Sequence, residues 1–226
     1  MIEERYIKNL PFLSPEECAR LHGKRVLIAG CGGLGGYAIE LLLRAGVGKM
    51  TAVDGDVFQP SNLNRQLLSE DAWIGKSKAE AAAARAKQIA PKAEVRAVRA
   101  YLDEANAGSL LADCDAALDA LDNIPSRRTL VRACGRIGIP VIHGAVWGWN
   151  AQAAVLMPGD GLLDRIYPDE APASCGESAL PVTAALCGAM QASLCIQVLC
   201  GRAVETGVVH YADVQRLTVE KIGSLR

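Results

Sequence analysis

The sequence lacks any excess of one charge and has very few aromatic residues. Its 24 lysine and arginine residues are balanced by 25 acidic ones, which leaves a formal net charge of −1. This balance provides no basic field for nucleic acid, so a charged ligand must be held by a local site. Only two Phe occur among the 226 residues, and the dominant Ala, Leu and Val suit helices packed closely on a sheet.

The spacing of the cysteines excludes two common kinds of site. None of the eight cysteines lies in a Cys-x-x-Cys pair, the spacing that structural zinc or a redox disulfide favours. We therefore expect no zinc. Several cysteines lie inside apolar runs, where free thiols act as small buried hydrophobes, and this usage indicates a reducing, cytoplasmic compartment.

Targeting and membrane signals are also missing. The charged N-terminus lacks the apolar centre of a signal peptide. The most apolar run covers residues 181–200, but it contains Thr183, Gln191, Ser193 and Gln197. We therefore predict a buried helix rather than a membrane span, and no membrane partner.

Apolar runs between turn signals predict alternating strands and helices. Val26-Leu27-Ile28 is typical of a strand buried on both faces. Strand, glycine turn, helix and strand follow in order from residue 24, and this βαβ unit predicts an α/β, Rossmann-like, doubly wound and mostly parallel sheet with helices on both faces and a late antiparallel extension. The predicted strands are 24–29, 50–54, 94–100, 115–121, 140–144 and 151–157, with a strand or hairpin over 208–222; the predicted helices are 15–21, 37–45, 77–90, 125–138 and 181–200.

The length suits a single domain over residues 1–226. We divide it into an N-terminal helical arm (1–23), a nucleotide-binding core (24–157), a crossing loop (158–181), and a C-terminal helix with strands (182–226). The crossing loop is rich in Gly, Pro, Asp and Glu. Loops of this length are uncommon unless they are functional or disordered, so we predict a lid or a segment that the substrate crosses.

A glycine-rich turn predicts a nucleotide site. The string Gly30-Cys31-Gly32-Gly33-Leu34-Gly35 fits Gly-x-Gly-x-x-Gly between a strand and a helix. Glycines let the backbone approach a phosphate, and the helix N-terminus offers free N–H groups and a positive dipole end. Asp54 ends the next strand, where a carboxylate accepts hydrogen bonds from ribose hydroxyls. These residues do not choose between NAD and ATP.

Three charged residues favour a triphosphate. Arg65 lies in a polar loop soon after Asp54, and Lys78 lies in the first turn of a helix, where its charge opposes the helix dipole and requires a compensating anion. Asp122, at the carboxyl end of a predicted strand, could hold Mg²⁺ together with phosphates and waters. Taken alone, each residue fits a solvated surface or turn position better. Their combination favours ATP and Mg²⁺.

Together with further strings, these motifs resemble those of the ThiF/MoeB/HesA adenylyltransferases, relatives of the ubiquitin-activating enzymes. The resemblance covers nearly the whole chain. Because the chain is compact and lacks the zinc cysteines, it looks most like ThiF-like members, which act on a ThiS-like carrier. The strings that carry it are Gly-Cys-Gly-Gly-Leu-Gly-Gly (30–36), Ala-Gly-Val-Gly (45–48), Asp-Gly-Asp (54–56), Ser-Asn-Leu-Asn-Arg-Gln (61–66), Ile-Gly-Lys-Ser-Lys (74–78), Leu-Asp-Asn (121–123), Gln-Ala (191–192) and Tyr-Ala-Asp (211–213).

The resemblance implies adenylation of the C-terminal Gly-Gly carboxylate of a ubiquitin-like sulfur-carrier protein, with release of pyrophosphate and later sulfur transfer from a donor. The carrier could serve thiamine, molybdenum- or tungsten-cofactor, or cysteine pathways. The implied roles are ribose and phosphate binding for Gly30, Gly32, Gly33, Gly35 and Asp54; the phosphate site for Asp56, Asn64, Arg65, Gln66 and Asn123; contact with the phosphates being separated for Lys78; and Mg²⁺ for Asp122.

Two positions depart from the resemblance. The family is usually a homodimer in which the partner chain supplies an arginine near its N-terminus, but Lys8 stands at that place here, and lysine cannot form a bidentate fork. Cys175 stands where some relatives keep a cysteine that takes the activated carrier. It is either a catalytic nucleophile or an incidental loop thiol, and the sequence leaves both open.

Aromatic and histidine residues outside these motifs receive structural interpretations. We expect His143 and His210, in strand-like segments, to satisfy local hydrogen bonds rather than to catalyse. Trp147 and Trp149 flank a glycine near a strand end. They either shape a groove for the substrate tail or form an edge or dimer contact.

Three rival functions remain for comparison. A relative could adenylate another carboxyl group, on a tRNA base or a peptide, although the charge of −1 disfavours tRNA. An NAD-dependent oxidoreductase would have no use for Arg65, Lys78 and Asp122 together. A non-catalytic scaffold would be expected to lose these phosphate residues first.

Overall fold

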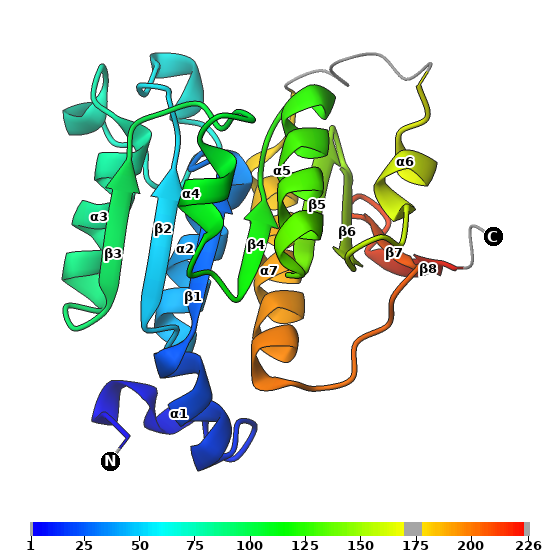
Figure 1. Cartoon of the computed structure of the whole chain (residues 1–226). Coiled ribbons are helices and arrows are strands. Elements are labelled where there is room, and N and C mark those ends of the chain that lie inside the picture. The colour runs from blue at the N-terminus through cyan, green and yellow to red at the C-terminus, as the bar shows by residue number, and fades with distance from the viewer. Residues whose placement is uncertain (1, 170–177, 224–226) are drawn as a thin grey trace.

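The computed structural model describes residues 2–169 and 178–223, and in this part of the chain eight strands form one sheet. Figure 1 shows helices in front of the sheet and behind it. The strands are β1 (Arg25–Ala29), β2 (Lys49–Val53), β3 (Glu94–Val98), β4 (Ala116–Asp119), β5 (Val141–Trp147), β6 (Asn150–Leu156), β7 (Val209–Asp213) and β8 (Thr218–Ile222). The helices are η1 (Glu4–Asn9), α1 (Pro15–Gly23), α2 (Gly33–Ala45), η2 (Pro60–Asn62), η3 (Asp71–Trp73), α3 (Lys78–Ile89), α4 (Ala107–Leu111), α5 (Ile124–Ile137), α6 (Leu162–Ile166) and α7 (Pro181–Cys200).

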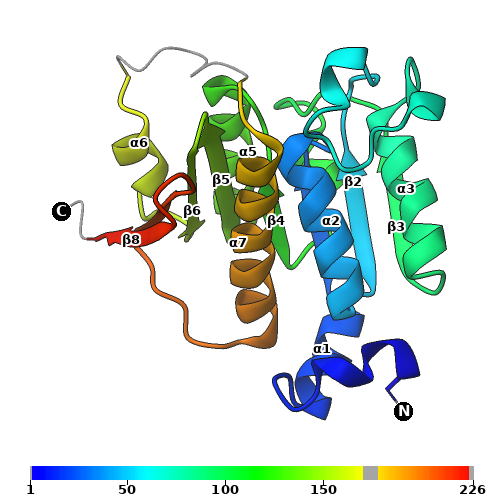
Figure 2. The same ribbon diagram turned by 180° about the vertical axis from the view of Figure 1, so that it is seen from behind.

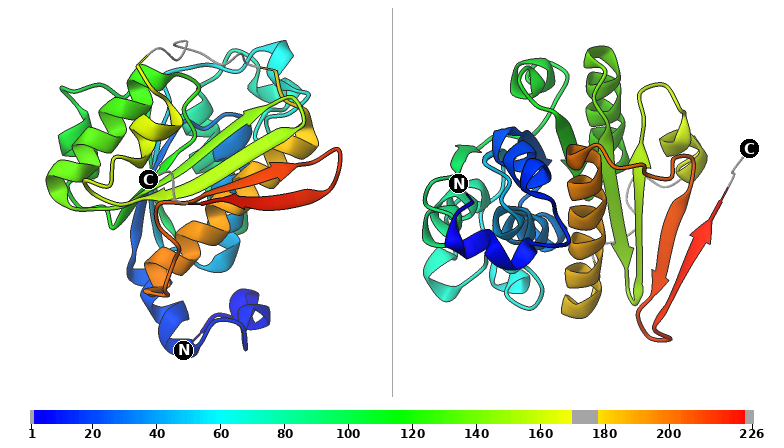
Figure 3. Two further views of the ribbon diagram at one scale, coloured as in Figure 1. Left: turned by 90° about the vertical axis from the view of Figure 1, so that its right-hand side faces the viewer. Right: turned by 90° about the horizontal axis from the view of Figure 1, so that it is seen from below.

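The order of the strands confirms the predicted doubly wound sheet. It runs β3-β2-β1-β4-β5-β6-β7-β8. The first five strands are parallel, and β6, β7 and β8 add to them in antiparallel pairs. Figure 3 shows β7 and β8 as a hairpin at one end of the sheet. From β1 the chain first adds strands on one side, β2 and β3, and then returns to add β4 and β5 on the other side of β1. Such a switch point opens a crevice at the carboxyl ends of the strands.

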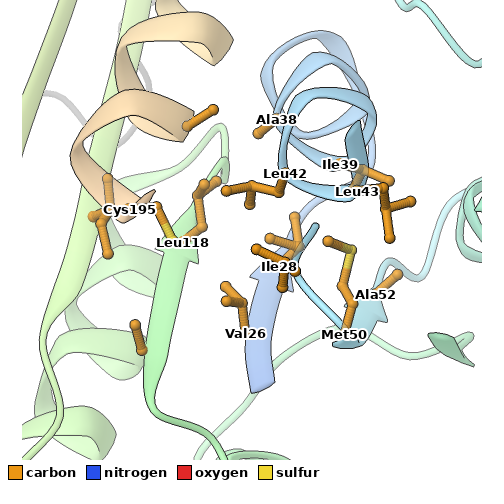
Figure 4. Packing of buried hydrophobic residues seen from close by; sticks show 14 of the residues in the cluster. Val26, Ile28, Ala38, Ile39, Leu42, Leu43, Met50, Ala52, Leu118 and Cys195 are labelled. Atoms are coloured by element: carbon orange, nitrogen blue, oxygen red, sulfur yellow. The ribbon is translucent and has the colours of Figure 1, made fainter. Parts of the chain in front are cut away.

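Alternating side chains of the central strands divide the core into two layers. Val26 and Ile28 point to one face of β1, and Leu27 and Ala29 to the other. Helices α2, α3 and α7 cover the first face (Figure 2), and α4, α5 and α6 cover the second. Figure 4 shows the first layer, in which Leu42 and Leu43 of α2 pack over the strands. Burial on both faces explains the continuous apolar run of β1.

Helix α7 is the buried helix that the sequence predicts. By length and composition alone it could cross a membrane, but half of its most apolar window is buried inside the fold. Its central amide, Gln191, is completely buried and donates to the backbone oxygens of Asp119 at 2.7 Å and Ile142 at 3.1 Å. These bonds tie α7 to the last residue of β4 and to the first part of β5, which lies beside it. Gly144 leaves the room that the amide needs, because a β-carbon there would overlap it.

The N-terminal arm lies at the opposite end of the sheet from the carboxyl ends of the parallel strands (Figure 1). The Asn9 side chain donates to the Ala45 oxygen at 3.2 Å, at the last turn of α2, and Gly48 donates to the Leu21 oxygen. The glycine turn begins α2 at its other end. Since α2 has 13 residues, about 20 Å of helix separates the arm from that turn.

Some element predictions were wrong in detail. The predicted crossing loop, 158–181, contains the five-residue helix α6, and α4 was also missed, because helices this short show no apolar periodicity. The predicted third and fourth strands end two residues too late, since β3 stops at Val98 and β4 at Asp119. Of the two alternatives left open for residues 208–222, the structure has the hairpin, formed by β7 and β8.

The close approach of α2 to β1 depends on Gly35. A β-carbon at this position would overlap the Gly30 carbonyl group, which belongs to the backbone and cannot rotate away. We expect Gly35→Ala to lower the free energy of unfolding by about 1–3 kcal/mol, the usual cost of overpacking, in chemical denaturation. Gly135→Ala in α5 is the matched control, because that β-carbon meets no atom within 4 Å. It should stabilise the fold by about 0.5–1 kcal/mol. Equal stability of the two variants would contradict this account.

Candidate active site

A cavity of about 740 Å³ opens at the switch point of the sheet. Its lining comes from the loops that follow β1, β2, β3 and β4, with further residues from the β5–β6 hairpin and the start of α7. Because four parallel strands end here, side chains far apart in sequence meet at one edge. The cavity therefore lies where the sequence predicts a nucleotide.

The glycine turn and Asp54 form one rigid unit. The two Asp54 carboxylate oxygens accept the Cys31 N–H at 2.7 Å and the Asp56 N–H at 2.8 Å. Burial raises the pKa of Asp54, and these hydrogen bonds offset the increase only in part. Gly30 has φ +95°, a conformation that favours glycine. Asp54 thus joins the loops after β1 and β2, and it lines the cavity with a carboxylate that can accept further hydrogen bonds.

Lys78 has the anionic partner that its place in the helix requires. Its side chain is 9% exposed, and Nζ lies 3.0 Å from Oδ2 of Asp56. Burial alone would raise the pKa of Asp56, but hydrogen bonds from Tyr101 and Lys78 bring it below its ordinary value. The buried ammonium is therefore paired with a carboxylate, and both residues line the cavity.

The loop before α3 supplies further polar groups. The Arg65 guanidinium donates to the Ser61 oxygen at 3.0 Å and to Oδ1 of Asn64 at 2.9 Å, and Arg65 lines the cavity. Gln66 lines it beside Gly32, with a buried Oε1 that has no hydrogen-bond partner in the described part of the chain. Polar groups held at the wall of a glycine turn suit a phosphate chain.

Asp122 and Asn123 lie across the cavity, after β4. The Asn123 side chain caps α5 by accepting the Ser126 N–H at 2.9 Å, and its amide donates to Oδ1 of Asp122 at 3.0 Å. Asp122 is exposed, so its carboxylate is oriented by its neighbour but open to a ligand. Within residues 2–169 and 178–223, no group of three or more His, Cys, Asp or Glu side chains could hold a metal ion. A divalent cation at Asp122 would thus need oxygens from phosphates and water.

A buried ionic network forms the floor behind Asp122. Arg127 donates to Oδ2 of Asp119 at 3.1 Å and to the Gly144 oxygen at 2.7 Å, and it also contacts the Leu121 oxygen next to Asp122. Burial would raise the pKa of Asp119, but the Arg127 guanidinium and the His143 ring bring it below its ordinary value. The network fixes the backbone that carries Asp122.

His143 extends this network towards α6. Its Nδ1 lies 2.8 Å from Oδ2 of Asp119, and its Nε2 lies 3.3 Å from the Tyr167 hydroxyl. Burial lowers the pKa of His143, and the hydrogen bond to Asp119 offsets this only in part. A neutral ring with the proton on Nδ1 donates to Asp119 and accepts from Tyr167. His143 therefore satisfies local hydrogen bonds, as predicted.

Small residues line the other end of the cavity. They are Gly33 of α2, Ala145 and Val146 of β5, and Ala179 and Ala184 near the start of α7. Gly148 donates to the Ser178 oxygen at 2.9 Å, which holds the chain before α7 against the β5–β6 turn. Short side chains leave room for a narrow, extended ligand next to the glycine turn.

The cavity brings together most of the predicted site residues. Its lining includes Gly30, Gly32, Gly33, Asp54, Asp56, Arg65, Gln66, Lys78, Asp122 and Asn123. Two predicted residues are not among the described lining: Gly35 packs beneath Gly30, and Asn64 is exposed and contacts Arg65. Cys175 lies outside the described residues. Trp147 and Trp149, at the β5–β6 turn, are 62% and 43% exposed, and neither is among the described residues that line the cavity.

Sequence reasoning missed several contributors to the cavity wall, including one cation and one aromatic residue. Arg127 and Tyr101 both line it. Arg127 lies one turn after the Asp122-Asn123 pair, a cation in the first turn of a helix like Lys78, and that same signal could have identified it. Tyr101 is a single aromatic residue after an edge strand, and no pattern in the sequence distinguishes it.

Comparison with known proteins identifies the family of the chain. The model of the ThiF family matches residues 4–223. The chain belongs to the ThiF family. It is 40% identical over 171 residues to the SAMP-activating enzyme E1 of Haloferax volcanii, a match that covers 75% of this chain but 63% of that protein. It is 34% identical over 186 residues to the molybdopterin-synthase adenylyltransferase of Escherichia coli strain K12, covering 80% of this chain and 75% of the relative.

Solved structures share the fold of this ThiF-family chain. The crystal structure of E. coli MccB superposes with a TM-score of 0.81 at 16% identity, over 99% of this chain and 70% of that one. The crystal structure of E. coli tRNA N6-threonylcarbamoyladenosine dehydratase, TcdA, in complex with AMP, superposes with a TM-score of 0.73 at 22% identity, over 89% of this chain and 97% of that one. At these identities the likeness establishes the fold.

The buried His143 makes stability depend on pH. Because its pKa in the folded state lies below the ordinary value of 6.5, the unfolded state binds more protons just below that pH, and stability falls as the pH is lowered through it. We expect the melting temperature to decline between about pH 7.5 and about pH 5.5, and His143→Gln, although destabilised, to decline less steeply. Thermal unfolding across this range measures both slopes. An unchanged slope in the variant would assign the pH dependence to other groups.

Proposed function

We propose that the chain is an ATP- and Mg²⁺-dependent adenylyltransferase that activates the C-terminal carboxylate of a ubiquitin-like sulfur-carrier protein ending in Gly-Gly. The observation that carries this proposal is the convergence of Lys78, Arg65 and Asp122 around the glycine turn in one cavity. The names of the two relatives, a SAMP-activating enzyme and a molybdopterin-synthase adenylyltransferase, support the reaction and the class of partner.

In this reaction a carboxylate oxygen of the carrier attacks the α-phosphorus of ATP. The new bond is an acyl–phosphate bond, and the bond from the α-phosphorus to the bridging oxygen of the β-phosphate breaks, so pyrophosphate leaves with that electron pair. The attack needs no proton transfer and no side-chain nucleophile. The chain must instead align two anions and offset the charge that moves to the leaving group.

The residues of the cavity can perform these tasks. In this proposal the amides of the glycine turn and the N-terminus of α2 would bind a phosphate, Asp54 would accept from ribose hydroxyls, and Arg65 and Lys78 would offset the charge of the leaving pyrophosphate. The single open carboxylate of Asp122 fits a cation that is shared with phosphates, and bound Mg²⁺ would neutralise phosphate charge there. The small residues at Gly33, Ala145 and Ala184 suit a tail without side chains.

The rival functions fit less well. A nicotinamide dinucleotide has no phosphate chain long enough to use Lys78, Arg65 and Asp122 together. Another acyl substrate is the stronger rival, because the structural neighbours include a tRNA-modifying enzyme. The balanced charge of the chain favours a protein carrier over tRNA, and the relatives of higher identity point the same way.

The position of the N-terminal arm supports a homodimer. Lys8 is exposed and lies on the arm at the far end of α2 from the glycine turn, so it cannot reach the cavity of its own chain. We propose that it serves the site of a second copy, as the family resemblance implies. The seven described cysteines are free thiols, in keeping with the reducing, cytoplasmic compartment we propose for the enzyme.

ATP–pyrophosphate exchange tests the reaction. With Mg²⁺, exchange should appear only when a small carrier ending in Gly-Gly is added. Asp122→Asn keeps the size and the hydrogen bond to Asn123 but removes the charge, so exchange should fall at least about 100-fold, a loss typical of one electrostatic group, with an unchanged melting temperature. Full exchange in this variant would remove Asp122 from the site. ATP binding without exchange for any carrier would favour another acyl substrate.

The role of Cys175 stays a prediction, because this residue lies outside the described part of the chain. Adenylation as written needs no thiol, so Cys175→Ser should leave pyrophosphate exchange unchanged and affect only transfer of sulfur to the carrier. Exchange and carrier thiocarboxylate formation, measured side by side by mass spectrometry, separate the two steps. A loss of exchange would place Cys175 in the adenylation step.

A further inference from the structure

Tyr101 is an exposed aromatic side chain that is nevertheless held in place. The residue is 70% exposed, yet its hydroxyl donates to Oδ1 of Asp56 at 2.7 Å. A β-carbon at Gly55 would lie 2.8 Å from three ring atoms, Cδ1, Cδ2 and Cε1. Contact with three ring atoms at one distance means that the ring lies face-on over Gly55. One face of the ring is thus covered, and its free face accounts for the exposure.

The backbone of Tyr101 is fixed as well. The Asn106 amide donates to the Tyr101 oxygen at 2.8 Å and accepts the Asp103 N–H at 3.0 Å. Oδ1 of Asp103 in turn accepts the N–H groups of Ala105 and Asn106, both at 2.9 Å. This hydrogen-bonded turn follows β3 and fixes the backbone position from which the Tyr101 side chain extends.

Burial does not explain these anchors. A side chain that remains 70% exposed gains little from leaving water, so two restraints on the side chain and one on its backbone call for another reason. Tyr101 lines the nucleotide cavity together with the apolar side chains of Val53, Leu102 and Leu121. A fixed aromatic face beside apolar groups is suited to a flat, aromatic ligand, since the ring loses no freedom when the ligand binds.

We infer that Tyr101 is a specificity-determining residue of the nucleotide site, and that the purine base of the bound nucleotide packs on the free face of its ring. The inference rests on the proposed nucleotide-binding function and extends it to a residue after β3. The hydroxyl bond to Asp56 and the flat contact with Gly55 orient the ring. Asp54, two residues before Asp56, then meets the ribose next to the base.

Binding of nucleotides and of inorganic tripolyphosphate to the full chain separates base contacts from phosphate contacts. Tyr101→Leu removes the aromatic face and should weaken ATP and AMP about tenfold in calorimetric titrations, as expected for the loss of one base–aromatic stack, while tripolyphosphate affinity stays unchanged. Tyr101→Phe is the matched control, because it keeps the ring and loses only the bond to Asp56. It should retain most of the ATP affinity. Circular dichroism checks that both variants are folded.

Each contrary result has a distinct meaning. If Tyr101→Leu weakens ATP and tripolyphosphate equally, Tyr101 acts through Asp56 and Lys78, and the base contact is refuted. If Tyr101→Phe is as weak as Tyr101→Leu, or if neither variant changes ATP affinity, the stacking role is also wrong, although the proposed function survives. If the unmodified chain binds neither ATP nor AMP, the proposed function itself fails, and this inference fails with it.

Discussion

The arrangement of the whole site depends on the Asp54 carboxylate, which connects two of its loops. This carboxylate accepts one N–H from the glycine turn after β1 and one from the loop after β2, so the two loops cannot move independently. The Asp56 that it positions then pairs with Lys78 of α3 and with Tyr101 after β3. Three strand ends and one helix are thereby connected through two carboxylates. A buried acid pays a desolvation cost for this role, which appears as its raised pKa.

A second set of contacts serves the opposite side of the crevice. Arg127 and Asp119 form a buried ion pair beneath β4 and β5, and Gln191 of α7 donates to the backbone at the end of β4 and near the start of β5. Breaking a buried pair is costly because it leaves an uncompensated charge, so the backbone around Leu121 and Asp122 has one arrangement. The two halves of the site meet at the junction of β1 and β4, where the sheet reverses its order, and where α2 packs against α7. A ligand in the crevice therefore bridges two independently braced halves.

The sequence predicts those parts of the structure that local signals encode. The βαβ unit follows from Val26-Leu27-Ile28, the glycine turn and Asp54, and the need for an anion near Lys78 follows from the helix dipole alone. Contacts between residues distant in sequence could not be predicted. Tyr101 and Asp56 are 45 positions apart, and no local pattern at either residue indicates the other. The buried cluster of Asp119, Arg127 and His143 was missed for the same reason. Helix α6 was missed because five residues make little more than one turn.

The pairing of Lys78 with Asp56 also concerns ionic strength. A free surface cation gathers salt ions, and a phosphate that binds to it gains entropy by releasing them. Lys78 is largely buried and is already neutralised by a carboxylate of its own chain, so it holds no such ions to release. A phosphate that takes the place of Asp56 exchanges one internal anion for another. The affinity of this site for an anionic ligand should thus depend less steeply on salt concentration than the number of cationic side chains in the site would suggest.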